Sequence, residues 1–278
     1  MSDYTHQSAR TEEDPIAGTP PGTTQPPWSQ IRGTQPTPGN GTINGDYHPT
    51  TETNNKFRLR ANIRIASMNV NGATAPSENM NFLVKWETIS RTIYNEKVAI
   101  LAIQEAHLDE TMTERIQTLY EKNLEIIVSA NPESPRARAG VAFIINKWLI
   151  SPEEIETHEL IPGRAQTLKI KWLKTCSASI LNIYAPNKRN SHLEFWATIL
   201  TERHNRHLPI PDFTLGDFNV TEDAIDRMPA KLDDETAIEA LRDVKAEWNM
   251  RDMWRWANPM EREFTYRAKT QTDQCKVT

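Results

Sequence analysis

Four apolar runs of this sequence end abruptly in short polar groups, and this repetition restricts the fold more than the overall composition does. Apolar runs that alternate strictly, or that continue without interruption, are typical of strands buried on one or both faces. Strand ends in a layered fold are rigid, and functional sites are usually built in the loops that leave them. The four runs end in "SMNVNG", "AIQEA", "IYAPN" and "LGDFN", which carry Asn69 and Asn71, Gln104 and Glu105, Tyr184 and Asn187, and Asp217 and Asn219.

The remaining patterns predict strands and helices in mixed order. A helix is predicted over residues 77–95, with Ser77 as its N-cap and with Phe82, Trp86 and Ile89 on one face. Further helices are predicted over residues 113–121, 191–207 and 233–250. Strands follow one another closely over residues 124–130, 139–145, 154–160, 165–173 and 177–184. Close spacing favours pairing between sequence neighbours, so we expect a mostly antiparallel region in a layered α/β sandwich.

The first 57 residues differ in composition from the rest of the chain. Proline, glycine, threonine and glutamine replace the aliphatic residues that folding requires, so we expect residues 1–57 to be a disordered tail and residues 58–278 to be the folded domain. The sequence has no secretory signal pattern and no run long enough to cross a bilayer, so we expect a soluble, intracellular protein that does not bind membranes. Its two cysteines are too few for a disulfide framework.

The net charge of −5 is local. Residues 221–247 contain nine acidic and four basic side chains, which accounts for the whole imbalance. The remainder is neutral overall, with basic clusters at "RAR", "KIKWLK" and "NKR". Taken singly, such clusters are more typical of solvated faces than of phosphate contacts.

The residue types at the four strand ends suit the hydrolysis of a phosphoester. A single carboxylate near an amide fits hydrated Mg²⁺, which keeps several waters. A second aspartate with a neighbouring asparagine could hold and deprotonate a water, while a tyrosine and another asparagine could bind phosphate oxygens. Each residue also has a simpler explanation: Glu105 could face solvent, Asp217 could make an Asx-turn, and Tyr184 could be a core residue. The combination of these residues at four strand ends favours a catalytic site over the simpler explanations.

The motif series resembles one known superfamily. "MNVNG", "AILAIQEAHL", "AGVAFII", "LNIYAPN" and "TLGDFN", followed by "DMWRWANPMEREFTYR", are similar to the endonuclease/exonuclease/phosphatase superfamily, and most to the endonuclease domains of LINE-type retrotransposons. The similarity covers about residues 63–267. It implies a four-layered α/β sandwich of the deoxyribonuclease I-like type, Mg²⁺-dependent hydrolysis of phosphodiesters, DNA as the partner and a nuclear location.

The resemblance also implies a role for each matched residue. Glu105 would be the Mg²⁺ ligand, with Asn69 in the metal site beside it. Tyr184 and Asn187 would bind the scissile phosphate. Asp217 would align or deprotonate the attacking water, and Asn219 would orient that water and the phosphate. Arg189 and Asn190 lie where relatives place a contact with the DNA backbone.

The sequence departs from the family after "FTYR". In relatives, a Ser-Arg-x-Asp segment and later an Asp-His pair follow, whereas this chain stops at Thr278 with neither. We therefore expect a sandwich that lacks its last strands, with an uncovered sheet edge and little or no activity as it stands. The other candidate histidines, His158, His192, His204 and His207, are expected on surface helices or loops.

Two alternatives to the endonuclease stay open. The hydrolase could act on another phosphoester, such as a phosphoinositide, a sphingolipid or an RNA tail. Alternatively, the domain could have lost catalysis and could bind nucleic acid through "RARAG" and "NKRN". Binding of DNA that weakens with salt, without turnover, would favour the second alternative.

Overall fold

The computed structural model describes residues 63–71, 79–173, 176–267 and 274–275 of the chain. The predicted tail over residues 1–57 and the predicted N-cap Ser77 lie outside these residues. The strands that build the two main sheets are β1 (Arg64–Asn69), β2 (Val98–Gln104), β3 (Leu124–Ser129), β4 (Val141–Asn146), β5 (Ile155–Ile161), β6 (Ala165–Leu173), β7 (Cys176–Tyr184) and β8 (Phe213–Asp217). The helices are α1 (Asn79–Asn95), α2 (Glu110–Tyr120), α3 (His192–Asn205), α4 (Glu235–Glu247) and α5 (Met253–Ala257).

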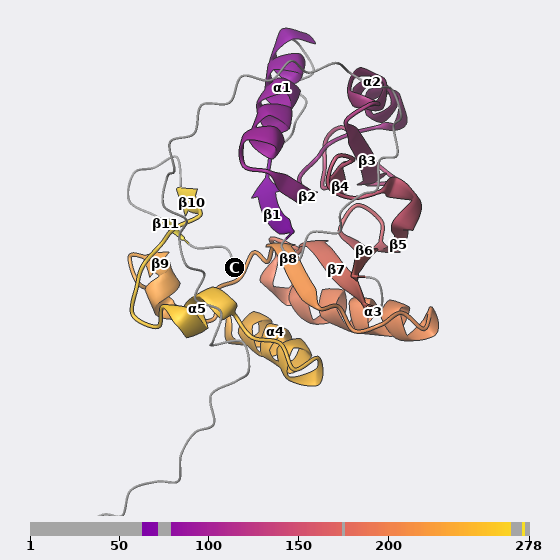
Figure 1. Cartoon of the computed structure of the whole chain (residues 1–278). Helices are drawn as coiled ribbons and strands as arrows, with labels where there is room; N and C mark the ends of the chain where they lie inside the picture. Colours follow the sequence, from indigo (N-terminus) through magenta and orange to yellow (C-terminus); the bar gives the residue numbers. More distant parts are fainter. Residues whose placement is uncertain (1–62, 72–78, 174–175, 268–273, 276–278) are drawn as a thin grey trace, which may run out of the picture. The chain divides into compact units, whose positions relative to one another are not determined.

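Two four-stranded sheets lie between two layers of helices (Figure 1). The first sheet has the order β1-β2-β4-β3 and packs its outer face on α1 and α2. The second has the order β5-β6-β7-β8 and packs its outer face on α3 and α4. The predicted four-layered α/β sandwich is confirmed. A small third sheet contains β9 (Arg227–Met228), β10 (Tyr266–Arg267) and β11 (Gln274–Cys275), so "FTYR" ends in β10.

Most strand pairs are antiparallel, as expected from their close spacing. Two pairs are parallel, namely β1 with β2 and β7 with β8. In both cases a helix connects the two strands, α1 in the first and α3 in the second. A parallel pair requires such a crossover connection, because a tight hairpin can join only antiparallel strands.

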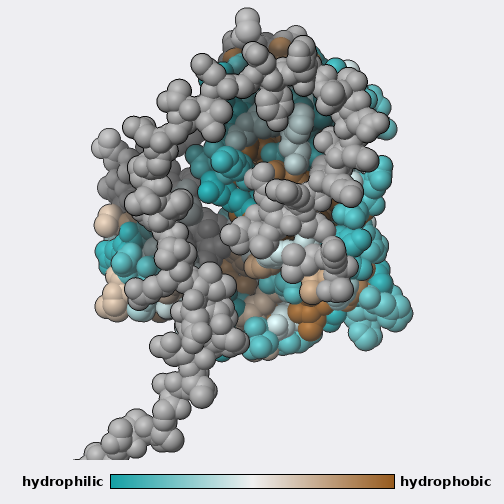
Figure 2. All heavy atoms as spheres, viewed as in Figure 1, coloured by the Kyte–Doolittle hydropathy of each residue, from teal (hydrophilic) through white to brown (hydrophobic). Residues whose placement is uncertain are grey.

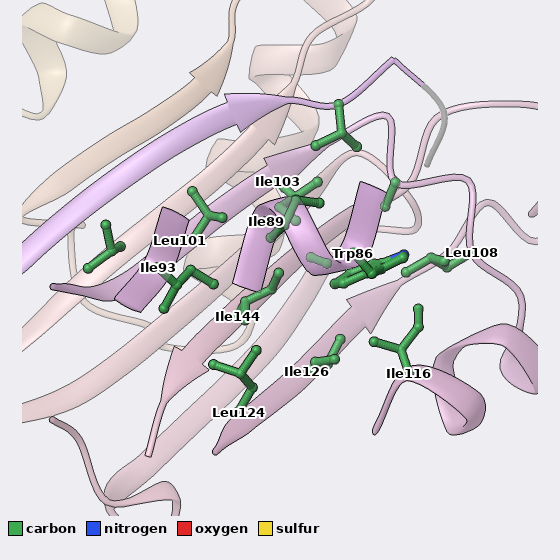
Figure 3. Close-up of a cluster of buried hydrophobic side chains, with 14 of the residues drawn as sticks. Trp86, Ile89, Ile93, Leu101, Ile103, Leu108, Ile116, Leu124, Ile126 and Ile144 are labelled. Carbon is green, nitrogen blue, oxygen red and sulfur yellow. The ribbon is translucent and has the colours of Figure 1, made fainter. Parts of the chain in front are cut away.

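Three apolar clusters hold the layers together. The cluster in Figure 3 joins Trp86, Ile89 and Ile93 of α1 to Leu101 and Ile103 of β2. A second cluster lies under α3 and α4, and a third fills the space between the sheets with residues such as Ile100, Phe143 and Ile180. Figure 2 shows many hydrophilic residues on the outer surface in this view, in agreement with a core that lies between the layers. No helix among the described residues is long and apolar enough to span a membrane.

Two sequence predictions need correction. Helix α2 begins at Glu110 rather than at residue 113, because the Asp109 side chain accepts a hydrogen bond from the Met112 amide and so caps the helix. His192 was expected at the surface, but it is only 1% exposed. It starts α3 in a buried position, and this burial lowers the pKa of its imidazole.

The edge strand β8 depends on a glycine next to the polar strand end. Gly216 has φ +139°, and a Cβ there would lie 2.0 Å from the carbonyl oxygen of Ile183 on β7. We expect Gly216→Ala to break the β7–β8 pairing and to lower the free energy of unfolding by roughly 3 kcal/mol or more. Urea unfolding followed by circular dichroism measures this. Thr214→Ala on the same strand is the control and should change the free energy by about 1 kcal/mol or less. Equal values for the two variants would contradict the prediction.

Candidate active site

Parallel pairing brings the four polar strand ends to one edge of the sandwich. The carboxyl ends of parallel strands lie at the same edge of a sheet. In the β1–β2 register Asn69 is opposite Gln104, and in the β7–β8 register Tyr184 is opposite Asp217. Each sheet therefore presents its own pair of polar residues at this edge.

The side chain of Asn69 joins the two sheets. Its Nδ2 donates to Oε1 of Glu105 at 3.0 Å and to Oδ2 of Asp217 at 2.8 Å. Its Oδ1 accepts a hydrogen bond from the backbone nitrogen of Asn71 at 2.8 Å, which fixes the direction of the amide. One amide group thus lies between two carboxylates that belong to different sheets.

Tyr184 and Asn219 extend this network. The Tyr184 hydroxyl donates to the Glu105 carboxylate. The backbone nitrogen of Asn219 donates to Oδ1 of Asp217 at 3.1 Å, and Nδ2 of Asn219 donates to the carbonyl oxygen of Ala185 at 2.8 Å. Five of the six residues assigned from sequence are therefore brought together.

The sixth residue and two neighbours behave differently. Asn187 is exposed, and its side chain makes no hydrogen bond with the residues that the structure describes. Its role in binding phosphate stays a prediction. Gln104 ends β2 at this edge, but its side chain is 1% exposed and points between the sheets, so it takes no part in the network. Asn71 contributes its backbone nitrogen to Asn69.

The backbone around the network is strained. Asn71, Glu105, His107 and Asn219 all have φ between 46° and 52°, the left-handed region that residues other than glycine seldom adopt. Such conformations persist only where the surrounding structure enforces them, and they cluster at functional sites. The four residues leave three of the four strand ends, so the strain coincides with the turns that present the polar groups.

Burial and negative charge keep the Tyr184 hydroxyl protonated. Its pKa is raised to about 12, first by burial and then by the charge of Glu105 and the hydrogen bond to it. Arg164 acts in the opposite direction but is outweighed. The Arg164 guanidinium lies 5.2 Å from the centre of the Tyr184 ring and donates to the Tyr184 carbonyl oxygen at 3.0 Å. The Tyr184 hydroxyl is thus a protonated hydrogen-bond donor in a fixed position at neutral pH.

Burial also raises the pKa of the Asp217 carboxyl, and the charge of Glu105 adds to this effect. The hydrogen bonds from Asn69 and Asn219 act against it, because they favour the charged form. A carboxylate whose pKa is raised is a stronger base than an exposed one. This suits a group that accepts a proton from water.

Two basic side chains near Glu105 were missed from the sequence. Lys85 of α1 donates to the carbonyl oxygen of Val70, just after β1. The charge of Glu105 raises the pKa of the Lys85 amine, although burial lowers it more. Burial likewise lowers the pKa of His107, two residues after Glu105. Lys85 could have been recognised because it is a lysine on the apolar face of the predicted helix. His107 could have been recognised because it follows Glu105 within "QEAHL".

Comparison with known proteins identifies the architecture. No protein-family model matches the sequence. An AP endonuclease from Archaeoglobus fulgidus has a similar structure, with a TM-score of 0.56 and 20% identity over 76% of this chain and 85% of that one. This chain has the fold of that AP endonuclease. The fold that the resemblance implied is confirmed.

Two further structures and one sequence are also similar to this chain. A 3′ phosphatase from Neisseria, bound to a product DNA hairpin, has a TM-score of 0.53 and 16% identity over 77% of this chain and 85% of that one. The endonuclease domain of the non-LTR retrotransposon TRAS1 has a TM-score of 0.50 and 11% identity over 78% and 83% of the two chains. The "Transposon TX1 uncharacterized 149 kDa protein" of Xenopus laevis is 30% identical over 116 residues, which is 41% of this chain and 9% of that protein.

The donor groups at the strand ends fit a hard, hydrated divalent cation. Glu105 offers a carboxylate at the strand end, with Asp217 nearby and the Asn69 amide between them. The described residues contain no group of three or more histidine, cysteine, aspartate or glutamate side chains that could hold a metal. Glu105 would supply one or two oxygens and water the rest, which is the pattern of Mg²⁺. Direct ligation by Asn69 would require its amide to turn Oδ1 toward Glu105.

The substitution Tyr184→Phe removes the hydroxyl, keeps the ring, and so tests the role of the hydroxyl alone. The ring is packed against Ala139 and Val141, so the variant should fold as the wild type does. If the hydroxyl donates to a phosphate oxygen, hydrolysis should slow by roughly 10²-fold. The ratio of rates should stay constant from about pH 6 to 9, because a pKa of about 12 keeps the hydroxyl protonated throughout. Plasmid nicking measures the ratio, with Tyr94→Phe on α1 as control. Equal rates for wild type and Tyr184→Phe would remove Tyr184 from the site.

Proposed function

We propose that this chain is a phosphodiester hydrolase that cuts DNA, an endonuclease of retrotransposon type that requires a divalent cation. The observation that carries the proposal is the network in which Asn69 bridges Glu105 and Asp217 at the shared edge of both sheets. Fold neighbours include an AP endonuclease and a retrotransposon endonuclease domain, and the sequence relative is a transposon protein. A DNA substrate also motivates the proposal of a nuclear location.

Each residue of the network has a distinct task in this reaction. Asp217 accepts a proton from the attacking water, and Asn219 holds the turn that aims Asp217. The Tyr184 hydroxyl donates to a phosphate oxygen on which negative charge develops. A divalent cation held by Glu105, with Asn69 beside it, would polarise the phosphoryl oxygen. Asn69 keeps the carboxylates of Glu105 and Asp217 in a fixed relation to each other.

Two basic loops next to the site support a polyanionic substrate. The loop that carries Arg138 contacts the strand end after Glu105, since Ala106 donates to the Gly140 carbonyl oxygen at 2.9 Å. Lys188 and Arg189 follow Tyr184 closely and are exposed. None of these three cations forms an ion pair within the described part of the chain. By contrast, Lys169 and Lys171 of "KIKWLK" pair with Glu156 and Glu154, as expected for a solvated face.

Nicking of supercoiled plasmid DNA tests the proposal. The protein is used in excess over plasmid, with Mg²⁺ or with a chelator. Nicking that needs the cation and is lost in Glu105→Ala supports the proposal. Binding of DNA that weakens with salt, without any nicking, would favour the non-catalytic alternative. If the protein cleaves a phosphoinositide, a sphingomyelin or an RNA tail in a parallel panel and leaves DNA intact, that phosphoester replaces DNA as the proposed substrate.

A further inference from the structure

Polar side chains also occupy the space between the two sheets, directly behind the site. The inner face of β2 carries Ile100, Ala102 and then Gln104, and that of β7 carries Ile180 and then Asn182. Both amides are fully enclosed, with 1% of Gln104 and none of Asn182 exposed. The inner rows thus change from apolar to amide one residue before Glu105 and two residues before Tyr184.

Gln104 and Asn182 form an amide clamp across the sheets. Nε2 of Gln104 donates to Oδ1 of Asn182 at 2.7 Å. Nδ2 of Asn182 donates to two backbone carbonyl oxygens of the opposite sheet, at 3.1 Å to Ile103 and at 3.0 Å to Ala142. Ser67 of β1 joins the clamp, because Gln104 Nε2 also donates to its Oγ at 3.1 Å. One side chain of β7 is therefore bound to three groups on two strands of the first sheet.

The clamp restricts sliding of one sheet over the other more than the apolar residues around it do. Apart from Gln166 on β6, the residues packed around the clamp between the sheets are apolar, and apolar contacts tolerate small sliding movements of one sheet over the other. Buried hydrogen bonds do not, because a displaced donor or acceptor is left unpaired at a large cost. The clamp therefore fixes the register of the sheets at the end where Asn69 must reach Glu105 and Asp217.

We propose that Gln104 and Asn182 are positioning residues, which hold the two sheets in the register that places Glu105 beside Tyr184 and Asp217. Their effect on hydrolysis rests on the proposed function. Their effect on geometry does not, because the hydrogen bond from Asn69 to Asp217 crosses between the sheets and can be observed without substrate.

The test removes the clamp while the core stays filled. Gln104→Met with Asn182→Leu replaces both amides by apolar side chains of similar size, an exchange that often leaves stability unchanged or higher. Gln104→Met alone keeps the two bonds from Asn182 to backbone carbonyls, so it serves if the double variant does not fold. Gln166→Leu is the matched control. Gln166 lies opposite Asn182 in the β6–β7 ladder and is 4% exposed, and its Oε1 has no hydrogen-bond partner within the described residues.

Two measurements give separate results. In metal-free protein, solvent exchange of the Asn69 side-chain amide protons is followed by NMR, with Asn69→Ser used to assign them. We expect exchange about 10-fold faster in the double variant, and wild-type exchange in Gln166→Leu. In nicking assays we expect kcat to fall roughly 10² times in the double variant with little change in KM, and by less in Gln104→Met, since a displacement of about 1 Å has such an effect on catalysis.

The outcomes distinguish this proposal from the proposed function. If wild type does not nick DNA but the double variant loses Asn69 protection, the clamp stands and the proposed function fails. If Asn69 protection is unchanged, the clamp is not a positioning device, whatever happens to activity. The clamp is also not a positioning device if the fall in kcat is fully explained by the lower Tm of the double variant. The proposal fails likewise if Gln166→Leu has the same effect as the double variant. For Gln104→Met alone, unchanged protection and unchanged kcat together overturn the proposal.

Discussion

Glu105→Gln is expected to abolish DNA nicking and to leave the protein folded. The glutamine keeps an oxygen that can accept from Asn69, so the network loses a charge and not its shape. Without the negative charge the site cannot hold a hard divalent cation, whose contribution to stabilising the transition state is several kcal/mol. The nicking rate should therefore fall by about 10³-fold or more. Rates are measured with protein in excess over supercoiled plasmid at saturating Mg²⁺.

The same substitution should not lower stability. Glu105 and Asp217 are two carboxylates that share one amide donor, and the negative charge of Glu105 disfavours that of Asp217. Removing one charge relieves this repulsion, so Tm in the presence of a chelator should equal or exceed that of the wild type. Glu133→Gln, in an exposed loop, is the control and should nick at the wild-type rate. Wild-type nicking by Glu105→Gln would show that the carboxylate does not hold the cation.

The four polar strand ends could be predicted because each followed a run with a clear strand pattern. What a single sequence could not provide was the face on which each side chain lies. Strand β2 is buried on both faces, so its apolar run has no alternation to reveal the direction of Gln104. Gln104 turned out to bind Asn182 between the sheets, whereas its neighbour Glu105 reaches the site. Two adjacent polar residues thus have different tasks.

The residues that sequence reasoning missed become recognisable only after packing. Lys85 lies three residues after Phe82, on the same helical face, where a long side chain can extend from an apolar surface to a polar one. Its partner, the Val70 carbonyl oxygen, belongs to a different element. Arg164 is likewise assigned by its place over Tyr184, 20 residues further along the chain. Contacts between distant segments decide these roles, and local pattern carries little information about them.

Asp217→Asn is the second substitution expected to remove activity, again by about 10³-fold or more, because the amide cannot accept a proton from water. The new asparagine also has one acceptor oxygen where the wild type has two, so its Nδ2 would face either Nδ2 of Asn69 or the backbone nitrogen of Asn219. Nicking is measured as for Glu105. Asp212→Asn, just before β8, is the control: its oxygen accepts from the Ser179 backbone nitrogen, a bond that asparagine can keep. The control should nick within about twofold of wild type.

The pH dependence of stability gives Asp217 a signature that does not depend on catalysis. Its folded-state pKa is raised above the unfolded value of about 3.9, first by burial, so the folded protein binds the proton more tightly than the unfolded chain does. The wild type must therefore lose stability as pH rises from the unfolded pKa through the folded one. Asp217→Asn has no proton to lose, so Tm of the variant minus Tm of wild type should grow over that window and become constant above it. Melting curves in a chelator from about pH 3.5 to 8 measure this difference. A Tm difference that stays flat, or that shrinks as pH rises, would mean that Asp217 is stabilised as an anion at the strand end. The shared edge of the two sheets would then lack the buried base that the proposed reaction requires.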